Sequence, residues 1–142
     1  MENKVALSIG NHHSDERGTV SFNNAFDASE IKRIYFIENK NTAIIRAWQG
    51  HKIEKRWFSA VQGSFIIKLI KIDNWDSPSN NLIPEIFTLD ATDLKILYVP
   101  QGYATSIQAL EEKSKLMVMV NFLIGETKDE YRFNSDYFDQ KN

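Results

Sequence analysis

Apolar residues in this chain fall into short runs that polar, turn-forming residues separate, and no run keeps a helical period. Many runs are rich in β-branched and aromatic residues, and several alternate between apolar and polar positions, as half-buried strands do. The residues expected to form strands are 5–9, 19–22, 31–37, 42–48, 86–89, 94–99, 103–109 and 116–123. Short strands about ten residues apart predict an all-β sandwich or barrel.

The segments between these runs carry turn chemistry. Two strand-like runs meet at Gln62-Gly63, and glycine takes the positive φ of a tight turn, so a β-hairpin is predicted there. Residues 11–18 are expected to form a polar turn, and residues 28–30 a short helical turn. Residues 71–84 are predicted to form a loop at the rim of the sheet.

Composition narrows the class of protein. The 142 residues fit a single domain over residues 1–142, with a core at about 15–123 and a polar C-terminal tail with spaced aromatic residues. Without cysteine, disulfides and thiolate metal sites are excluded. A net charge of −2 gives no support to nucleic-acid binding. The apolar patch at 5–9 is too short for a signal peptide or a membrane span, so a cytoplasmic protein is expected.

Charged and aromatic side chains concentrate between residues 46 and 57. This segment holds two arginines, two lysines, one histidine, one glutamate and two tryptophans. Because the whole chain is slightly acidic, a local basic cluster indicates either a site for a small anionic ligand or a solvated face. Residues two apart on a strand face the same side, so Gln49 and His51 are expected to point inward together.

Several motifs, in their order along the chain, resemble those of one group of cupins. They are Asp15-Glu16-Arg17-Gly18, the run 31–37, Arg46-x-x-x-x-His51-Lys52 followed by Gly63, and Val99-Pro100-Gln101-Gly102-Tyr103-Ala104. Together they cover roughly residues 15 to 123 and are similar to the WxcM-like dTDP-sugar 3,4-ketoisomerases and the dTDP-4-dehydrorhamnose 3,5-epimerases. The resemblance implies an RmlC-like jelly-roll barrel, a nucleotide-linked sugar as ligand and a homodimer.

The chain departs from both enzyme groups at their reacting residues. Gln49 takes the place of the first histidine of the Arg-Gly-x-His-Ala-His-Lys motif, and it also falls where the epimerases have their basic histidine. An amide cannot accept that proton. Arg56 falls on an epimerase lysine, and the epimerase tyrosine would lie near Met117 or Met119. Stereospecific 3,5-epimerisation by the usual groups is therefore not expected.

The metal-ligand positions of other cupins are only partly filled. Gln49, His51, Glu54 and Thr105 stand where metal-binding cupins carry a His-x-His pair, a glutamate and a third histidine. One imidazole and one carboxylate fall short of the three or four protein ligands that a first-row metal usually takes. We therefore expect neither a metal nor another cofactor.

The resemblance leaves His51 as the acid/base group for proton transfer beside a sugar ketone, since a neutral imidazole can carry a proton both ways. Gln49 would hold a sugar oxygen by hydrogen bonds, and Glu54 would orient the imidazole. Tyr35 and Tyr103 are candidates for hydroxyl contacts or for returning the proton. A lone histidine on a strand is more often a satisfied or surface residue, which is the alternative for His51.

Arginines are candidates for binding the diphosphate, because a guanidinium group matches phosphate oxygens. Arg46 would bind it from the same chain and Arg17 from a neighbouring subunit. An ordinary ion pair is the alternative for Arg46, and a turn-stabilising pair for Arg17. Arg56 and Lys55 are further candidates for substrate contacts, with a solvated face as their alternative.

Three functions remain open. The leading one is an isomerase or epimerase-like enzyme that acts on a dTDP-4-keto-6-deoxyhexose for surface polysaccharide synthesis. The second is a catalytically silent cupin that binds a nucleotide sugar or glycan and regulates or scaffolds a partner, which the loss of the first histidine and the tyrosine favours. The third is a small-molecule-binding barrel with no link to sugars. The enzymatic interpretation requires positions 46, 49 and 51 to project into the hollow of a barrel.

Overall fold

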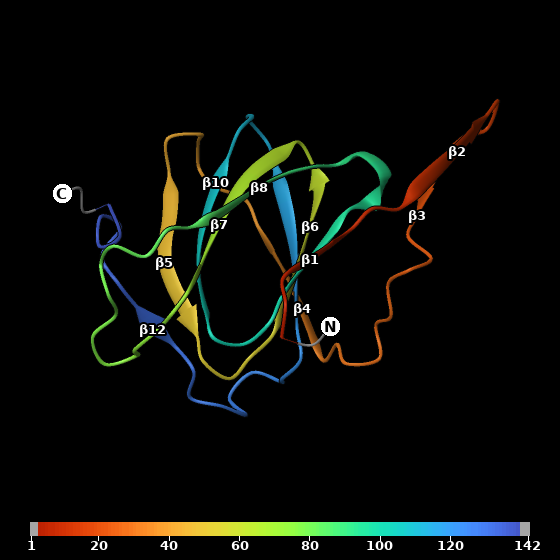
Figure 1. Cartoon of the computed structure of the whole chain (residues 1–142). Coiled ribbons are helices and arrows are strands. Elements are labelled where there is room, and N and C mark those ends of the chain that lie inside the picture. The colour runs from red at the N-terminus through yellow and green to blue at the C-terminus, as the bar shows by residue number, and fades with distance from the viewer. Residues whose placement is uncertain (1–2, 140–142) are drawn as a thin grey trace.

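The computed structural model describes residues 3–139, and almost all of their regular structure is β. Figure 1 shows two sheets that face each other and a separate hairpin that projects from them. The first sheet has the order β1 (Ala6–Ser8), β9 (Ile96–Val99), β6 (Arg56–Gln62), β11 (Lys115–Val120) and β4 (Arg33–Ile37). The second has the order β12 (Tyr131–Arg132), β5 (Ile45–His51), β10 (Tyr103–Ala109), β7 (Ser64–Lys71) and β8 (Glu85–Asp90). The all-β prediction is confirmed.

The helical content of the described residues is one 3-10 turn, η1 (Thr92–Leu94), between β8 and β9. No helix within residues 3–139 has the length and apolar character needed to cross a membrane.

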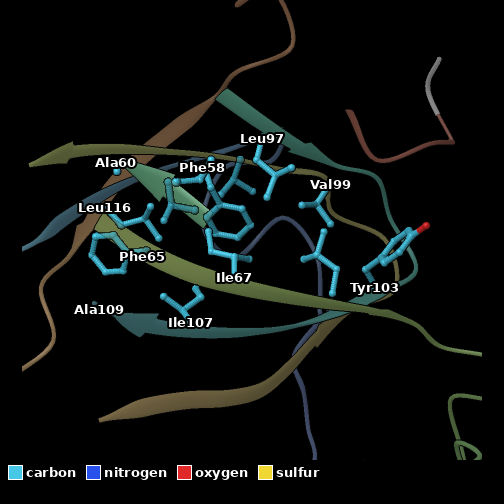
Figure 2. Close-up of a cluster of buried hydrophobic side chains, with 14 residues drawn as sticks. Phe58, Ala60, Phe65, Ile67, Leu97, Val99, Tyr103, Ile107, Ala109 and Leu116 are labelled. Carbon is cyan, nitrogen blue, oxygen red and sulfur yellow. The ribbon is translucent and has the colours of Figure 1, made fainter. Parts of the chain in front are cut away.

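An apolar cluster fills the space between the two sheets, as Figure 2 shows. On β6, Phe58 and Ala60 belong to this cluster, whereas Trp57 belongs to another cluster with Ile96 and Met119. Successive strand residues point to opposite faces, so one strand contributes to both clusters. The inner residues contributed by the facing strand β7 include Phe65, Ile67 and Leu69.

The C-terminal tail covers part of the second sheet. Trp48, Ile70 and Phe138 form a buried cluster, and Trp75 and Phe133 pack against it. Backbone hydrogen bonds of 3.0 and 3.1 Å join Phe133 to Trp48 in both directions. The buried part of the chain thus reaches Phe138, past the core range of about 15–123 that the sequence suggested.

The predicted hairpin at Gln62-Gly63 is wrong. β6 and β7 do not pair with each other, because β6 lies between β9 and β11 in the first sheet and β7 lies between β10 and β8 in the second. Gly63 does have a positive φ of 71°, and a Cβ atom there would collide with the side chain of Ser114. The glycine turn therefore carries the chain from one sheet to the other.

Two further local predictions differ from the structure. Residues 11–18, expected to be a polar turn, contain strand β2 (Asn11–Asp15), which pairs with β3 (Gly18–Phe22) to form the projecting hairpin. Residues 28–30 form a turn closed by a 3.0 Å bond from the Ile31 amide to the Ala28 carbonyl, and not a helix. Both faces of the hairpin are largely exposed, so its residues are mostly polar and lack the apolar alternation that predicts a strand.

Candidate active site

An open cavity of about 1220 Å³ lies beside the apolar core, lined by strands β4, β5, β6 and β10 and by the C-terminal tail. Six of the nine side chains predicted as site residues line it. They are Tyr35, Arg46, Gln49, His51, Glu54 and Arg56. The strand from 45 to 51 is thus one wall of a hollow.

A register shift in β5 brings Arg46 to the same wall as Gln49 and His51. Strict alternation would send position 46 to the opposite face from 49 and 51. The ladder with β10 shifts, however, so that Thr105 lies opposite Gln49 while Ile107 lies opposite Arg46. A bulge of this kind re-aims side chains near a site, and all three predicted positions line the cavity.

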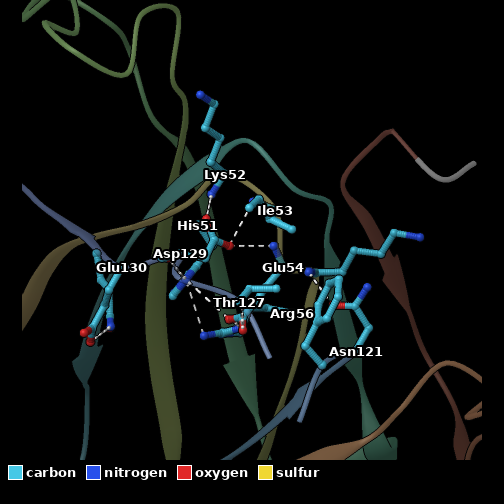
Figure 3. Close-up of polar contacts among 12 residues, drawn as sticks. His51, Lys52, Ile53, Glu54, Arg56, Asn121, Thr127, Asp129 and Glu130 are labelled. Atoms are coloured by element: carbon cyan, nitrogen blue, oxygen red, sulfur yellow. Dashed lines mark hydrogen bonds and ion pairs between the residues drawn. The ribbon is translucent and has the colours of Figure 1, made fainter. Parts of the chain in front are cut away.

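His51, Glu54 and Arg56 form a buried polar cluster, drawn in Figure 3. Arg56 Nη1 donates to Glu54 Oε1 at 2.8 Å, and Arg56 Nη2 lies 3.4 Å from His51 Nδ1. A second guanidinium, that of Arg33, lies 3.9 Å from Glu54 Oε1. Each charge is therefore matched by an opposite charge at short range, as burial requires.

The environment of His51 keeps its imidazole neutral. Burial, followed by the positive charge of Arg56, lowers the pKa of His51 to about 4, against a smaller opposing effect of Glu54. Burial raises the pKa of Glu54, but the hydrogen bond from Arg56, the positive charge of Arg56 and the hydrogen bond from Thr127 together outweigh it, so the net pKa is lowered. The site therefore holds an ionised carboxylate beside an uncharged imidazole at neutral pH.

The free nitrogen of His51 opens toward the cavity. The contacts of the ring with described residues all involve Nδ1, whose other neighbour is the Asp129 carbonyl oxygen at 3.3 Å. Among residues 3–139, Trp48 Nε1 is the fully buried side-chain nitrogen without a hydrogen-bond partner. His51 Nε2 has no partner there either but is not fully buried, so it is accessible from the cavity that His51 lines.

Asp129, from the C-terminal tail, fixes the turn after β5. Its Oδ1 accepts the amide of Lys52 at 2.7 Å, and its Oδ2 accepts those of Ile53 and Glu54 at 2.8 and 2.6 Å, contacts visible in Figure 3. Asp129 was not among the residues predicted from the sequence. Nothing in its local pattern distinguishes it from other acidic residues of the polar tail.

His51, Glu54 and Asp129 offer ligand atoms within 4.8 Å of one another. Both oxygens of Asp129 accept backbone amides, and the two oxygens of Glu54 accept Arg56 and Thr127. A cation would have to displace these donors and lie beside a guanidinium group. The donor set thus fits an internal ion-pair network better than a first-row metal site.

The rim of the cavity carries a second polar group. Gln49 Nε2 donates to Glu130 Oε1 at 3.3 Å, and Arg132 Nη2 donates to the same oxygen at 2.9 Å. Arg46 Nε donates to Asn39 Oδ1 at 2.8 Å. Gln49 and Arg46 were predicted from the sequence. Arg33, Glu130 and Arg132, which come from β4 and the tail, were not.

Three predicted residues lie outside the cavity lining. Tyr103 is buried in the apolar core, and burial, aided by the charge of Glu85, raises its pKa. Arg17, at the tip of the projecting hairpin, pairs with Asp15 at 2.7 Å, and 84% of its side chain is exposed. Lys55 forms an ion pair with Glu30 at 2.9 Å.

The chain is similar to known proteins over nearly its whole length. The family model described as FdtA: WxcM-like, C-terminal matches residues 3–142. No curated protein matches the chain.

Several solved structures share the fold. The chain is 23% identical to the 3,4-ketoisomerase QdtA from Thermoanaerobacterium thermosaccharolyticum, a mutant in complex with TDP-4-keto-6-deoxyglucose, with a TM-score of 0.70 over 95% of this chain and 91% of that chain. It is 18% identical to the TDP-quinovose 3,4-ketoisomerase WlaRB from Campylobacter jejuni, with a TM-score of 0.70 over 96% and 98%.

A third similar structure is the dTDP-4-dehydrorhamnose 3,5-epimerase of Bacillus anthracis, with 18% identity and a TM-score of 0.70 over 88% of this chain and 76% of that chain. These proteins are RmlC-like cupins, so the expected architecture is confirmed. Because the family model spans nearly the whole sequence, the chain belongs to the family described as FdtA: WxcM-like, C-terminal.

Proposed function

We propose that this protein is a cytoplasmic isomerase or epimerase-like enzyme. Its substrate is a dTDP-linked 4-keto-6-deoxyhexose, on which it moves a proton next to the ketone, for surface polysaccharide synthesis. The observation that carries the proposal is a neutral, buried His51 open to a cavity with arginines in its wall. Similar folds named as ketoisomerases, one of them bound to TDP-4-keto-6-deoxyglucose, support the choice of substrate.

His51 is the proposed acid/base group of this reaction. A hydrogen next to a ketone is acidified, and its removal gives an enediol that accepts a proton at the neighbouring carbon. Glu54 and Arg56 fix the ring from the Nδ1 side, which leaves Nε2 for the substrate. No metal enters this mechanism, because the nearby carboxylate oxygens already accept donors from the protein.

The cavity arginines are the proposed diphosphate ligands. Arg46 Nε contacts Asn39 Oδ1 at 2.8 Å, and among residues 3–139 no hydrogen bond occupies its terminal guanidinium nitrogens. Guanidinium groups bind phosphate oxygens through parallel N–H donors, so this orientation suits a diphosphate. Tyr35, under the guanidinium of Arg33 at 5.4 Å, is the proposed hydroxyl contact for the sugar.

The enzyme is proposed to be a homodimer. The β2–β3 hairpin projects from the molecule in Figure 1, and an isolated two-stranded hairpin is marginally stable in water. Val20 on this hairpin is 64% exposed. Packing against a second copy would cover it and would bring Arg17 toward the partner's cavity.

A second candidate function is a catalytically silent nucleotide-sugar or glycan binder. Gln49 favours it, since an amide stands at the position of a basic histidine in related enzymes. Met117 and Met119, where a tyrosine acid would lie, pack with Trp57 and Ile96 away from the inner core cluster. Such a protein would bind the ligand and leave its carbon-bound hydrogens unchanged.

One experiment separates these functions. The protein is incubated with dTDP-4-keto-6-deoxyglucose in deuterated water, and the hydrogens at C3 and C5 are followed by NMR. Exchange at C3 with formation of a new keto sugar supports the isomerase. Stabilisation of the fold by TDP without exchange supports the silent binder, because a ligand of the native state raises the melting temperature. If neither exchange nor stabilisation is observed, the barrel has no nucleotide-sugar function.

A further inference from the structure

Four carboxylates line the cavity, and two of them are fully engaged. They belong to Glu38, Glu54, Asp129 and Glu130. Both oxygens of Glu54 and both oxygens of Asp129 accept hydrogen bonds at 3.0 Å or less. Donors of the protein thus already contact all four of these oxygens, whereas Glu38 and Glu130 each have one oxygen without a contact among residues 3–139.

Glu38 lies at the far end of β4 from His51. The strand begins at Arg33, whose guanidinium is 3.9 Å from Glu54, and Glu38 follows five residues later. Five strand residues span about 16 Å. Glu38 also faces Lys115, at 4.0 Å. It is therefore remote from the imidazole.

Glu130 lies next to His51 and has one oxygen available. The Gln49 amide and the Arg132 guanidinium both donate hydrogen bonds to Oε1. Oε2 has no hydrogen-bond partner among residues 3–139. Gln49 precedes His51 by two residues on the same wall, and the carbonyl of the adjacent Asp129 lies 3.3 Å from His51 Nδ1. Along the strand, Gln49 and His51 are two residues, or about 7 Å, apart. The contact with Gln49 therefore places the Glu130 carboxylate on the cavity wall that carries the imidazole.

We propose that Glu130 Oε2 is the base that removes the carbon-bound proton, while His51 Nε2 acts on the ketone oxygen. This assignment rests on the proposed function and divides its acid/base work between two residues. The base must approach the carbon, and the nitrogen the neighbouring oxygen, each to about 3 Å. Both groups lie on the same wall of the cavity, so one sugar ring can contact both of them.

The proposed step balances without a further reactant. The C–H bond next to the ketone breaks, its proton moves to Oε2, and its electron pair forms the C=C bond of the enediolate. The carbonyl electron pair moves to the oxygen, which His51 stabilises by a hydrogen bond. The proton then returns from Glu130 to the former carbonyl carbon, while the proton of the neighbouring hydroxyl passes to the oxygen that carried the ketone.

The chemistry of the two side chains suits these roles. A carboxylate base paired with a neutral imidazole as hydrogen-bond donor is an established arrangement in enzymes that form enediolates. Gln49, which cannot accept a proton, orients the base through its amide group. The same contact explains how an amide can stand at this position in an active enzyme.

The test measures deuterium uptake at C3 of dTDP-4-keto-6-deoxyglucose for the wild type, Glu130→Gln, Glu130→Ala and the matched control Glu112→Gln. Glu112 is an exposed glutamate in the turn before β11, outside the cavity lining. A general base contributes about 100- to 10,000-fold to rate. Glu130→Gln should therefore lose at least about 100-fold in kcat with little change in KM, while Glu112→Gln keeps the wild-type rate.

Chemical rescue separates a reacting carboxylate from a structural one. Added formate should restore part of the exchange rate of Glu130→Ala, because it can occupy the vacated space as a small base. It should leave Glu130→Gln unchanged, because the amide fills that space. Circular dichroism spectra and melting temperatures show whether each variant is folded.

Two outcomes overturn the assignment in distinguishable ways. If the wild type exchanges C3 and Glu130→Gln exchanges it at a similar rate, Glu130 is not the base and the proposed function stands. If the wild type binds TDP but exchanges no carbon-bound hydrogen, the isomerase function itself fails and the base assignment fails with it. Loss of exchange in Glu130→Ala without rescue by formate would also count against a direct role.

Discussion

At the scale of single residues, this site depends on buried charges that satisfy one another. Arg56 pairs with Glu54 and abuts His51, and Asp129 closes the turn that carries Glu54 by accepting three consecutive amides. Hydrogen bonds to a charged acceptor contribute more than neutral ones, and buried amides left unpaired are costly. The geometry of the imidazole therefore rests on a carboxylate from the tail.

Replacing Asp129 by alanine tests this dependence. Three amides would lose their acceptor, and we expect the free energy of unfolding to fall by about 3 kcal/mol. Urea denaturation measures it. The matched control is Asp136→Ala on the same tail, where the side chain is exposed and a change within about 0.5 kcal/mol is expected. Equal effects of the two substitutions would contradict the role of Asp129.

His51 should make the fold sensitive to mild acid. Its pKa is lowered to about 4 in the folded protein, against an ordinary value of 6.5. Between these values the unfolded chain binds a proton that the folded chain does not, so stability falls as pH falls. From pH 7 to pH 5 this residue should remove about 2 kcal/mol from the free energy of unfolding.

Urea denaturation at both pH values checks this contribution. His51→Gln should lose the corresponding part of the pH dependence, while the exposed His13→Gln should keep the wild-type dependence. Glu54, whose pKa is lowered, acts in the same direction only at still lower pH, where its carboxylate takes up a proton. An unchanged difference between pH 7 and pH 5 in His51→Gln would show that the imidazole is not buried as described.

At the scale of elements, strand β5 joins the cavity to the tail. Its inner face carries Gln49 and His51, while Gly50 between them lies under the ring of Trp75. A Cβ atom on Gly50 would lie 2.7 Å from Trp75 Cζ3 and 3.3 Å from Phe133. Trp75 packs against Tyr131 with ring centroids 4.7 Å apart and the rings tilted by 52°, so the glycine allows the loop before β8 to pack on the tail.

Gly50→Ala should therefore loosen this packing. Overpacking of this kind costs about 1–3 kcal/mol, which a urea titration can resolve. In a Trp75→Ala background the same substitution should cost much less, because the colliding ring is gone. An equal cost in both backgrounds would mean that the destabilisation arises from the strand backbone and not from a collision with the Trp75 ring.

At the scale of the whole molecule, two sheets enclose the core and the cavity, and one hairpin stands apart from both. Figure 1 shows β2 and β3 extending away from the sheets. The backbone contact of Gly10 with Asp93 and the ion pair of His12 with Asp93 fasten the hairpin to η1 at its base. Its tip has no such support from this chain within the described residues, which is why a second copy is proposed to cover it.

The oligomeric state follows from that proposal. Light scattering after size exclusion should give twice the mass of one chain. Val20→Glu, which places a charge on the exposed hairpin, should shift the protein toward the monomer. Ile83→Glu is the matched control, because Ile83 is 88% exposed in the loop before β8 and lies far along the chain from the hairpin. A monomeric wild type would contradict both the proposed homodimer and the proposed role of Arg17 in the partner's cavity.

Much of the site follows from the sequence because its strand has a local period. Alternation placed Gln49 and His51 on one face, and the basic residues between 46 and 57 marked the strand as unusual. Lys55 was chosen from the same segment and Tyr103 from the motif at residues 99–104, yet Lys55 pairs with Glu30 and Tyr103 lies in the core. Local pattern identifies the strand, but it does not say which neighbours reach the same cavity.

The amino-acid pattern by itself determined the all-β class and the inner faces of the strands, because side-chain alternation depends only on consecutive residues. Tertiary structure alone decided that β6 and β7 enter different sheets, that a bulge turns Arg46 inward, and that Asp129 and Glu130 reach β5 from about 80 residues away. These features depend on which strand edges meet across the fold. Strand edges offer the same amides and carbonyls whatever the side chains, so no local pattern specifies the partner.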